Sequence, residues 1–154
     1  MNINNENIGR VEIFDFDGTL VDTQLPDTGK PIWKEKTGND WPHIGWWGRV
    51  ESLDLDVFEQ KPKEEIVEAL TKANATEGTL TVLLTGRRKK TPIMDAVKAI
   101  LTKNSLTLDE YRFNYGGETG DNKIEQMSNL LELYPNVRTM TMFDDRVSHF
   151  EKFN

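Results

Sequence analysis

Hydrophobic and polar positions follow two alternating patterns along the chain. Short runs of apolar and β-branched residues predict strands over 11–16, 79–84, 111–115 and 137–143. Apolar side chains spaced by three and four residues predict helices after Pro62, after Pro92 and over 124–134, with a short helix or tail at 147–153. We expect Pro62 in the first turn of its helix and Thr91 as the N-cap before Pro92. Strands that alternate with helices predict an α/β, Rossmann-like parallel sheet with helices on both faces.

Residues 22–60 interrupt this pattern. They are rich in glycine and proline and show little periodicity, so we predict an irregular insertion after the first strand. The four tryptophans of the chain lie in it: Trp33, Trp41, Trp46 and Trp47. We interpret 1–154 as a single domain in which 22–60 forms a flap or small cap.

Polar residues gather at the predicted strand ends. Asp15 and Asp17 end the first strand, Thr85 ends the second, and Asp144 with Asp145 ends the last. Ligands of an open parallel sheet bind at the carboxyl ends of its strands. We expect Lys123, at the start of the third predicted helix, on the same side, which would bring all these groups to one edge.

Asp15 and Asp17 are two residues apart, so on a strand their side chains point to one face while Phe14 and Phe16 point to the other. Two carboxylates this close repel one another unless a cation lies between them or one of them is protonated. Mg²⁺ prefers such oxygen ligands, and a protonated aspartate can donate to a leaving alkoxide. Taken alone, the pair is also compatible with two solvated aspartates in a turn.

The remaining polar residues favour a phosphate site. Thr85, Gly86 and Arg87 offer a hydroxyl, turn amides and a guanidinium, all of which suit phosphate oxygens. Lys123 adds a compact positive charge, and Asp144 and Asp145 add carboxylates for a cation. Each has an ordinary structural explanation by itself. Their joint occurrence at strand ends makes the functional interpretation the better one.

These motifs resemble the haloacid dehalogenase-like (HAD) superfamily. FDFDGTL at 14–20, LLTGR at 83–87, Lys123 and FDDR at 143–146 match its four motifs in order. Together with GWW at 45–47 and the pair Thr119 and Lys123, they look like the HAD domain of Swiss Army Knife RNA-repair-like proteins, over about residues 11–150. TGR and FDDR also resemble the 3′-phosphatase domain of polynucleotide kinase-phosphatases.

The resemblance implies a mechanism. Asp15 would attack phosphorus and form an aspartyl-phosphate, and Asp17 would protonate the leaving group and then activate water. Mg²⁺ would be held by Asp15, the backbone carbonyl of Asp17 and the acidic pair, with Asp145 favoured as the ligand and Asp144 supporting Lys123. Thr85 and Lys123 would complete the catalytic set.

The insertion and a basic run indicate the substrate. The insertion is short, so we expect a nearly capless enzyme whose Trp46 and Trp47 either stack on nucleobases or pack the flap. The only dense basic run is 87–90, beside the predicted pocket. Besides Thr85, Gly86, Arg87 and Lys123, we therefore count Trp46 and Trp47 as candidate substrate-binding residues. We expect a phosphomonoester on a nucleotide or a nucleic-acid end, with a 3′-phosphate favoured.

Composition limits the alternatives. The absence of cysteine excludes a thiolate nucleophile and a disulfide framework, and the net charge of −7 disfavours a general nucleic-acid coat protein. We see neither a secretory signal nor a membrane span, and expect a cytoplasmic protein without an obligate protein partner.

Three other functions stay open. The first is a phosphatase of another phosphorylated small molecule or of a protein. The second is a binding module that holds a phosphorylated ligand without turnover, although such a module needs neither a nucleophile nor an acid. The third is a phosphoacceptor switch domain, in which the acidic pair comes first in the chain, whereas here it comes last.

Overall fold

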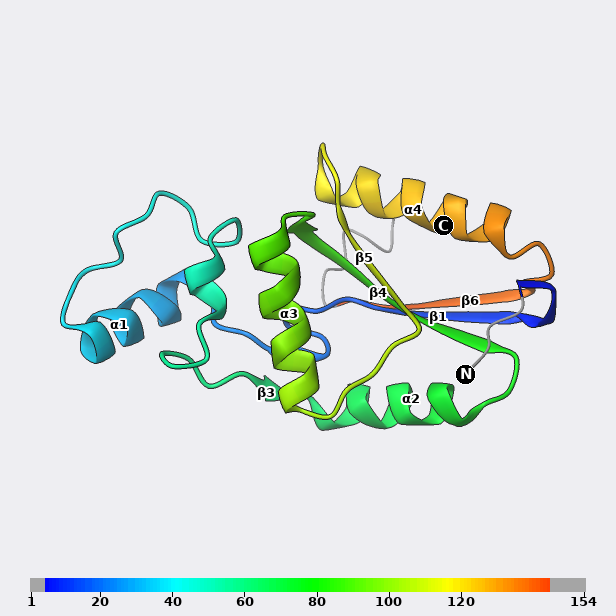
Figure 1. Ribbon diagram of the computed structural model, residues 1–154, viewed down its shortest axis with the longest axis horizontal. Coiled ribbons are helices and arrows are strands. Elements are labelled where there is room, and N and C mark those ends of the chain that lie inside the picture. Colours follow the sequence, from blue (N-terminus) through cyan, green and yellow to red (C-terminus); the bar gives the residue numbers. More distant parts are fainter. Residues whose placement is uncertain (1–4, 145–154) are drawn as a thin grey trace.

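The computed structural model describes residues 5–144 and is built on one parallel sheet (Figure 1). Its strands are β1 (Arg10–Phe14), β4 (Thr79–Arg88), β5 (Glu110–Asn114) and β6 (Thr139–Phe143), in the order β5-β4-β1-β6. All three pairings are parallel. The predicted parallel sheet is thereby confirmed. Asp145 and the predicted segment 147–153 lie outside the described residues.

Helices cover both faces of the sheet, as predicted. α2 (Glu64–Ala75) and α3 (Thr91–Lys103) share one hydrophobic core with Phe14 and Leu83, and α4 (Thr119–Leu133) shares another with Ile13 and Val82. Figure 1 shows α4 and α2 on opposite sides of the strands. Between residues 5 and 144, no helix has the length and apolar character to cross a membrane.

Three predicted boundaries differ from the structure. β4 continues to Arg88, with an irregular register between Leu84 and Arg88, so Thr85 lies within the strand and not at its end. Pro62 belongs to β3 (Lys61–Pro62), and α2 begins two residues later. Lys90, not Thr91, is the N-cap of α3, because Thr91 already has helical geometry.

The insertion 22–60, called the flap below, is more regular than predicted. It contains α1 (Pro26–Thr37) and a 3₁₀ helix (Val50–Leu53), and it joins the sheet through the antiparallel pair β2 (Val21–Asp22) and β3. The prediction of an irregular segment is therefore wrong. Pro26 at the first turn starts α1, and Gly38 ends it with φ 79°.

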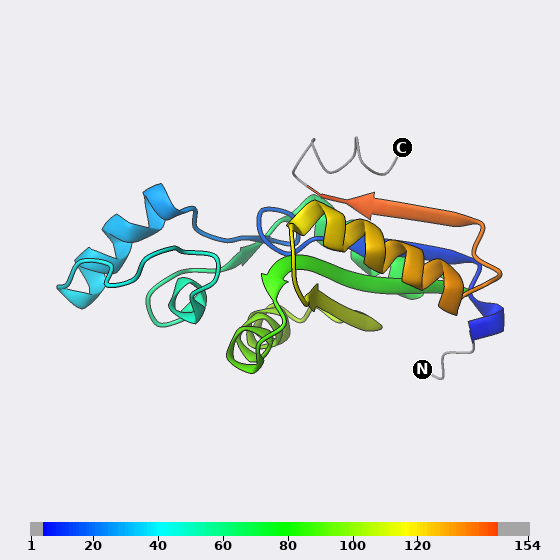
Figure 2. The same cartoon turned by 90° about the horizontal axis from the view of Figure 1, so that it is seen from above.

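A small core of its own holds the flap together. Trp46, Val57 and Phe58 are buried, and Trp33 and Trp41 pack against them. Figure 2 shows α1 projecting beyond one end of the sheet. The helix that sequence periodicity could not detect is therefore stabilised by tertiary contacts between aromatic rings.

Candidate active site

Asp15 and Asp17 lie in the turn that follows β1. The Asp15 residue is 3% exposed and the Asp17 side chain 11% exposed. Phe14 and Phe16 are fully buried in the core on the α2 and α3 side, as the alternation of strand side chains predicts. Gly18 then turns the chain with φ 73°, a conformation that favours glycine.

Lys123 connects the first and last motifs. Its Nζ lies 3.2 Å from Oδ1 of Asp15 and donates to Oδ2 of Asp144 at 2.6 Å. The lysine is 1% exposed and lies one turn into α4, not at its start as predicted. Asp15 and Asp144 come together because Phe14 pairs with Phe143 in the β1–β6 register, so both carboxylates follow neighbouring strand ends.

This arrangement leaves Asp15 with excess negative charge around it. Burial raises the pKa of Asp15 to about 7, Lys123 acts in the opposite direction, and Asp144 and Asp17 raise the pKa further. One buried ammonium therefore faces a cluster of carboxylates. Additional positive charge at this point would stabilise the ionised form of Asp15.

Arg87 pairs with Asp17 and also holds the flap. Its Nε and Nη2 donate to the two carboxylate oxygens of Asp17 at 2.9 and 2.7 Å. Its Nη1 donates to the Trp47 carbonyl at 3.1 Å and to Ser52 Oγ at 2.8 Å. Thr23 Oγ1 also donates to Asp17, at 2.7 Å. The predicted substrate arginine is thus only 3% exposed, and its guanidinium is directed at the second aspartate and at the flap backbone.

A pocket of about 320 Å³ opens at these groups. It is lined by Asp15, Asp17, Trp47, Gly86, Arg87 and Thr119. We call it the phosphate pocket, after the ligand that the sequence predicts for these residues. Thr119 was not among the predicted site residues, although its position four residues before Lys123 places both on one helix face.

Two predicted phosphate ligands lie behind the pocket wall. Thr85 is 1% exposed, and its hydroxyl accepts from the Arg87 N–H at 3.2 Å. Lys123 reaches the pocket only through Asp15. These two side chains support the residues that line the pocket.

The two tryptophans proposed for substrate binding have different surroundings. Trp46 is 3% exposed, packs in the flap core and donates from Nε1 to the Gln24 carbonyl at 3.0 Å. Trp47 lines the phosphate pocket, with the Arg87 guanidinium carbon 5.3 Å from its ring centroid. The prediction for Trp46 is therefore corrected, because its ring is enclosed within the flap. Trp47 remains a candidate.

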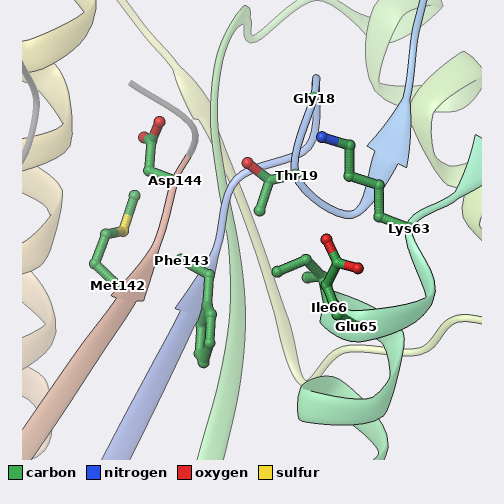
Figure 3. A pocket seen from close by; sticks show the side chains of 8 residues that line it. All are labelled: Gly18, Thr19, Lys63, Glu65, Ile66, Met142, Phe143 and Asp144. Atoms are coloured by element: carbon green, nitrogen blue, oxygen red, sulfur yellow. The ribbon is translucent and has the colours of Figure 1, made fainter. Parts of the chain in front are cut away.

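Two further pockets border the turn at Gly18, and Lys63 lines both. One, of about 290 Å³, lies toward Asp144, Thr19 and α2 (Figure 3). The other, of about 200 Å³, lies toward the flap and shares Asp17 and Trp47 with the phosphate pocket.

The donors at the turn fit a hard cation. Asp15 contributes a buried carboxylate whose pKa is raised first by burial and then by the negative charges of Asp144 and Asp17. Backbone hydrogen bonds of the turn use the carbonyls of Asp15, Phe16 and Val21, while no backbone N–H of the described residues donates to the carbonyl of Asp17. The described residues contain no cluster of three or more metal-binding side chains, and Asp145 lies outside them.

Comparison with known proteins identifies the family. The family described as "HAD domain family 1 in Swiss Army Knife RNA repair proteins" matches residues 32–154. The chain belongs to this HAD family. The match begins inside the flap, so the Asp15 motif is supported by the site geometry and not by the matched segment.

Other comparisons agree with the fold. The uncharacterized protein YMR265C of Saccharomyces cerevisiae is 26% identical over 167 residues, which cover 95% of this chain and 36% of that protein. A chain in the structure of the Pnkp1/Rnl/Hen1 RNA repair complex and a chain in a structure of the Pnkp1/Rnl/Hen1 complex align with TM-scores of 0.60, at 17% and 19% identity. These alignments cover 95% of this chain and 39% and 42% of the other chains. This HAD domain thus spans well under half the length of each of these proteins.

Proposed function

We propose that this HAD domain is a magnesium-dependent phosphomonoesterase that acts through an aspartyl-phosphate. The observation that carries the proposal is a buried carboxylate, Asp15, held by Lys123 in the wall of a pocket next to a second carboxylate, Asp17. Nucleophile and proton donor are then adjacent in one turn, and the chain has no cysteine to serve as nucleophile instead.

The reaction divides into two transfers. In the first, a carboxylate oxygen of Asp15 forms a bond to phosphorus, the bond to the leaving oxygen breaks, and Asp17 donates its proton to that oxygen. In the second, water attacks the phosphorus of the aspartyl-phosphate, Asp17 takes a proton from the water, and phosphate leaves as the Asp15 carboxylate is regenerated. Arg87 orients Asp17 through both oxygens of that carboxylate, so one of these hydrogen bonds must open before Asp17 carries the proton that it donates, while the other keeps its orientation.

Magnesium would be held by a carboxylate oxygen of Asp15, the carbonyl of Asp17 and the acidic pair Asp144 and Asp145. When bound, it supplies positive charge that offsets the charge of the transferring phosphoryl group. The Asp144 side chain already contacts Lys123, so Asp145 is the better candidate for the direct ligand. Lys123 orients Asp15 through its ion pair with Oδ1 of that carboxylate.

The proposed substrate is a phosphate at the end of a nucleic acid or on a nucleotide, with a 3′-phosphate favoured. Membership in a family of RNA repair proteins supports this substrate class. The aromatic ring of Trp47 at the pocket offers an apolar contact to a nucleobase. Arg88, Lys89 and Lys90 are exposed on the segment after Arg87 and would attract a phosphate backbone to an otherwise acidic chain.

The test is a comparison of kcat/KM for phosphate release from four substrates. These are a 3′-phosphorylated oligonucleotide, a nucleoside 3′-phosphate, a sugar phosphate and a phosphopeptide. We expect the oligonucleotide to lead. A tenfold lead of the sugar phosphate or the phosphopeptide, about 1.4 kcal/mol of transition-state preference, would contradict the nucleic-acid assignment but not the phosphatase.

A further inference from the structure

The smaller pocket, which shares Asp17 and Trp47 with the phosphate pocket, takes no part in the two proposed transfer steps. Asp17 and Trp47 form the boundary that the two pockets share. The rest of its wall comes from the turn and the base of the flap and includes Asp22, Leu25 and Lys63. Its volume is about 200 Å³, so it holds a group of limited size next to the reacting phosphate.

The geometry of phosphoryl transfer directs the leaving group toward this pocket. The attacking and leaving oxygens lie roughly in line on opposite sides of phosphorus. Asp15 lines the phosphate pocket, whereas Asp17 lines both pockets. A leaving oxygen placed to receive a proton from Asp17 and directed away from Asp15 therefore carries its substituent into the smaller pocket.

The chemistry of this wall matches a nucleoside. Leu25 is a large apolar side chain that is 58% exposed, and together with Trp47 it offers an apolar surface to a flat base. Asp22 is exposed and can accept hydrogen bonds from sugar hydroxyls or base N–H groups. An exposed leucine beside a half-buried tryptophan at the mouth of a polar site is better suited to a base than to a sugar phosphate.

Lys63 adds a positive charge to the wall of this pocket. Its backbone N–H donates to the Leu20 carbonyl at 3.0 Å, which fixes the residue at the start of α2. Its side chain is half-buried and extends toward the turn at Gly18 (Figure 3). Among residues 5–144 it forms no ion pair. A half-buried ammonium without an acidic partner in this part of the chain suits an anion of the ligand.

We propose that the smaller pocket binds the 3′-terminal nucleoside of the substrate and that Lys63 binds the phosphate on its 5′ side. The inference rests on the proposed phosphatase function and narrows its substrate class. The preferred substrates carry two phosphates on one nucleoside: a scissile 3′-phosphate at Asp15 and a second phosphate, free or in a phosphodiester, at Lys63.

The experiment compares adenosine 3′-phosphate with adenosine 3′,5′-bisphosphate, with products separated by chromatography so that removal of each phosphate is counted. For the wild-type chain we expect kcat/KM for 3′-phosphate release to be at least tenfold higher with the bisphosphate, mainly through KM. Lys63→Gln should reduce this ratio to about twofold or less. Lys72→Gln, an exposed lysine at the other end of the same helix, should keep the wild-type ratio.

The possible results test the subsite and the proposed phosphatase function separately. Equal rates for both nucleotides in the wild type, or an unchanged ratio in Lys63→Gln, would overturn the subsite while the phosphatase stands. If neither nucleotide is hydrolysed, equilibrium binding of both nucleotides is measured with Asp15→Asn and with the double variant Asp15→Asn/Lys63→Gln. This comparison tests the subsite without turnover. A tenfold tighter binding of the bisphosphate that depends on Lys63 supports it, and equal binding overturns it.

Discussion

Arg87 and Asp17 form a bidentate pair, with both carboxylate oxygens accepting from the same guanidinium at 2.9 and 2.7 Å. The third nitrogen of that guanidinium binds the Trp47 carbonyl and the Ser52 hydroxyl. The proposed acid is therefore coupled to the flap through one side chain. A movement of the flap would be transmitted directly to Asp17.

Replacing Arg87 with lysine tests this coupling. Lysine keeps the charge but cannot make the fork of parallel hydrogen bonds, so Asp17 loses its fixed orientation. We expect kcat to fall on the order of 10- to 100-fold with a smaller change in KM, because a misplaced catalytic group affects the chemical step most. Arg88→Lys, at the adjacent exposed position, is the control. Wild-type kcat in Arg87→Lys would show that the pair does not position Asp17.

Asp15→Asn should abolish turnover while the fold remains. The substitution keeps the size of the side chain but removes the nucleophilic carboxylate. Burial already disfavours the charged form of Asp15, as its pKa of about 7 indicates, so loss of the charge is tolerated by the core. We expect less than about 1% of wild-type phosphate release, a limit that follows from losing a covalent route altogether. Circular dichroism and thermal melting establish folding, and activity above a few per cent contradicts the mechanism.

Chelation should stop the reaction and lower the melting temperature. A cation that binds only the folded chain stabilises it by about 2.7 kcal/mol at a concentration 100 times its Kd. Melting curves in EDTA and in excess Mg²⁺ test binding without reference to activity, and phosphate release tests the reaction. Ca²⁺ should support turnover poorly, because it takes a larger and more flexible set of ligands. Full activity in excess EDTA would falsify the metal requirement.

The central sheet and the positions of the acidic residues could be predicted because each depends on local pattern. Strand runs, helical spacing and the carboxyl-end rule together place Asp15, Asp17 and Asp144 near one another, and the structure has them in one cluster. Lys123 was also expected there, and the register of β1 with β6 explains why Asp15 and Asp144 lie close enough for both to contact it.

The flap could not be predicted, because its stability comes from contacts between distant residues. Gly29 and Pro31 break the helical pattern of α1, but Trp46 packs over the buried Gly29 and compensates for its low propensity. The hydrogen-bond partner of Arg87 could not be predicted from the sequence either. Asp17 lies 70 residues away, and nothing local in the sequence connects the two.

Because Gly29 contacts Trp46, we expect Gly29→Ala to change stability in the direction opposite to the one that helix propensity alone would give. Replacing glycine with alanine inside a helix usually stabilises it by about 1 kcal/mol. A Cβ at Gly29 would lie 2.2 Å from Cη2 and 2.5 Å from Cζ2 of Trp46. The Trp46 ring cannot move freely, because its Nε1 is bonded to Gln24 and its faces are packed. Overpacking of this kind costs about 1–3 kcal/mol, so Gly29→Ala should destabilise the flap.

Limited proteolysis and tryptophan fluorescence measure the effect on the flap. Lys30→Ala, on the exposed side of the same helix, is the matched control and should be neutral or slightly stabilising. Faster cleavage within 22–60 in Gly29→Ala alone supports the packing role of Trp46. A stabilised flap in that variant would show that the Trp46 ring relocates at no cost.

The last prediction concerns Gly86 and Thr119, which lie against each other in the wall of the phosphate pocket. A Cβ at Gly86 would lie 2.5 Å from Cγ2 and 3.0 Å from Oγ1 of Thr119. Gly86→Ala must therefore displace the Thr119 side chain or push β4 and the start of α4 apart, and since both residues line the pocket, its shape changes. We expect kcat/KM to fall by about tenfold or more, in keeping with the sensitivity of transfer reactions to displacements near 1 Å.

Thr119→Ser provides the rescue. Serine lacks the methyl group that makes the closest contact and keeps the hydroxyl at the pocket. The double variant should recover a substantial part of the activity lost in Gly86→Ala, whereas Thr119→Ser alone should change little. Such non-additivity is expected of residues in direct contact and can be quantified in a double-mutant cycle of kcat/KM. If the effects of Gly86→Ala and Thr119→Ser on kcat/KM are additive, Gly86 is required for a reason other than the close approach of Thr119.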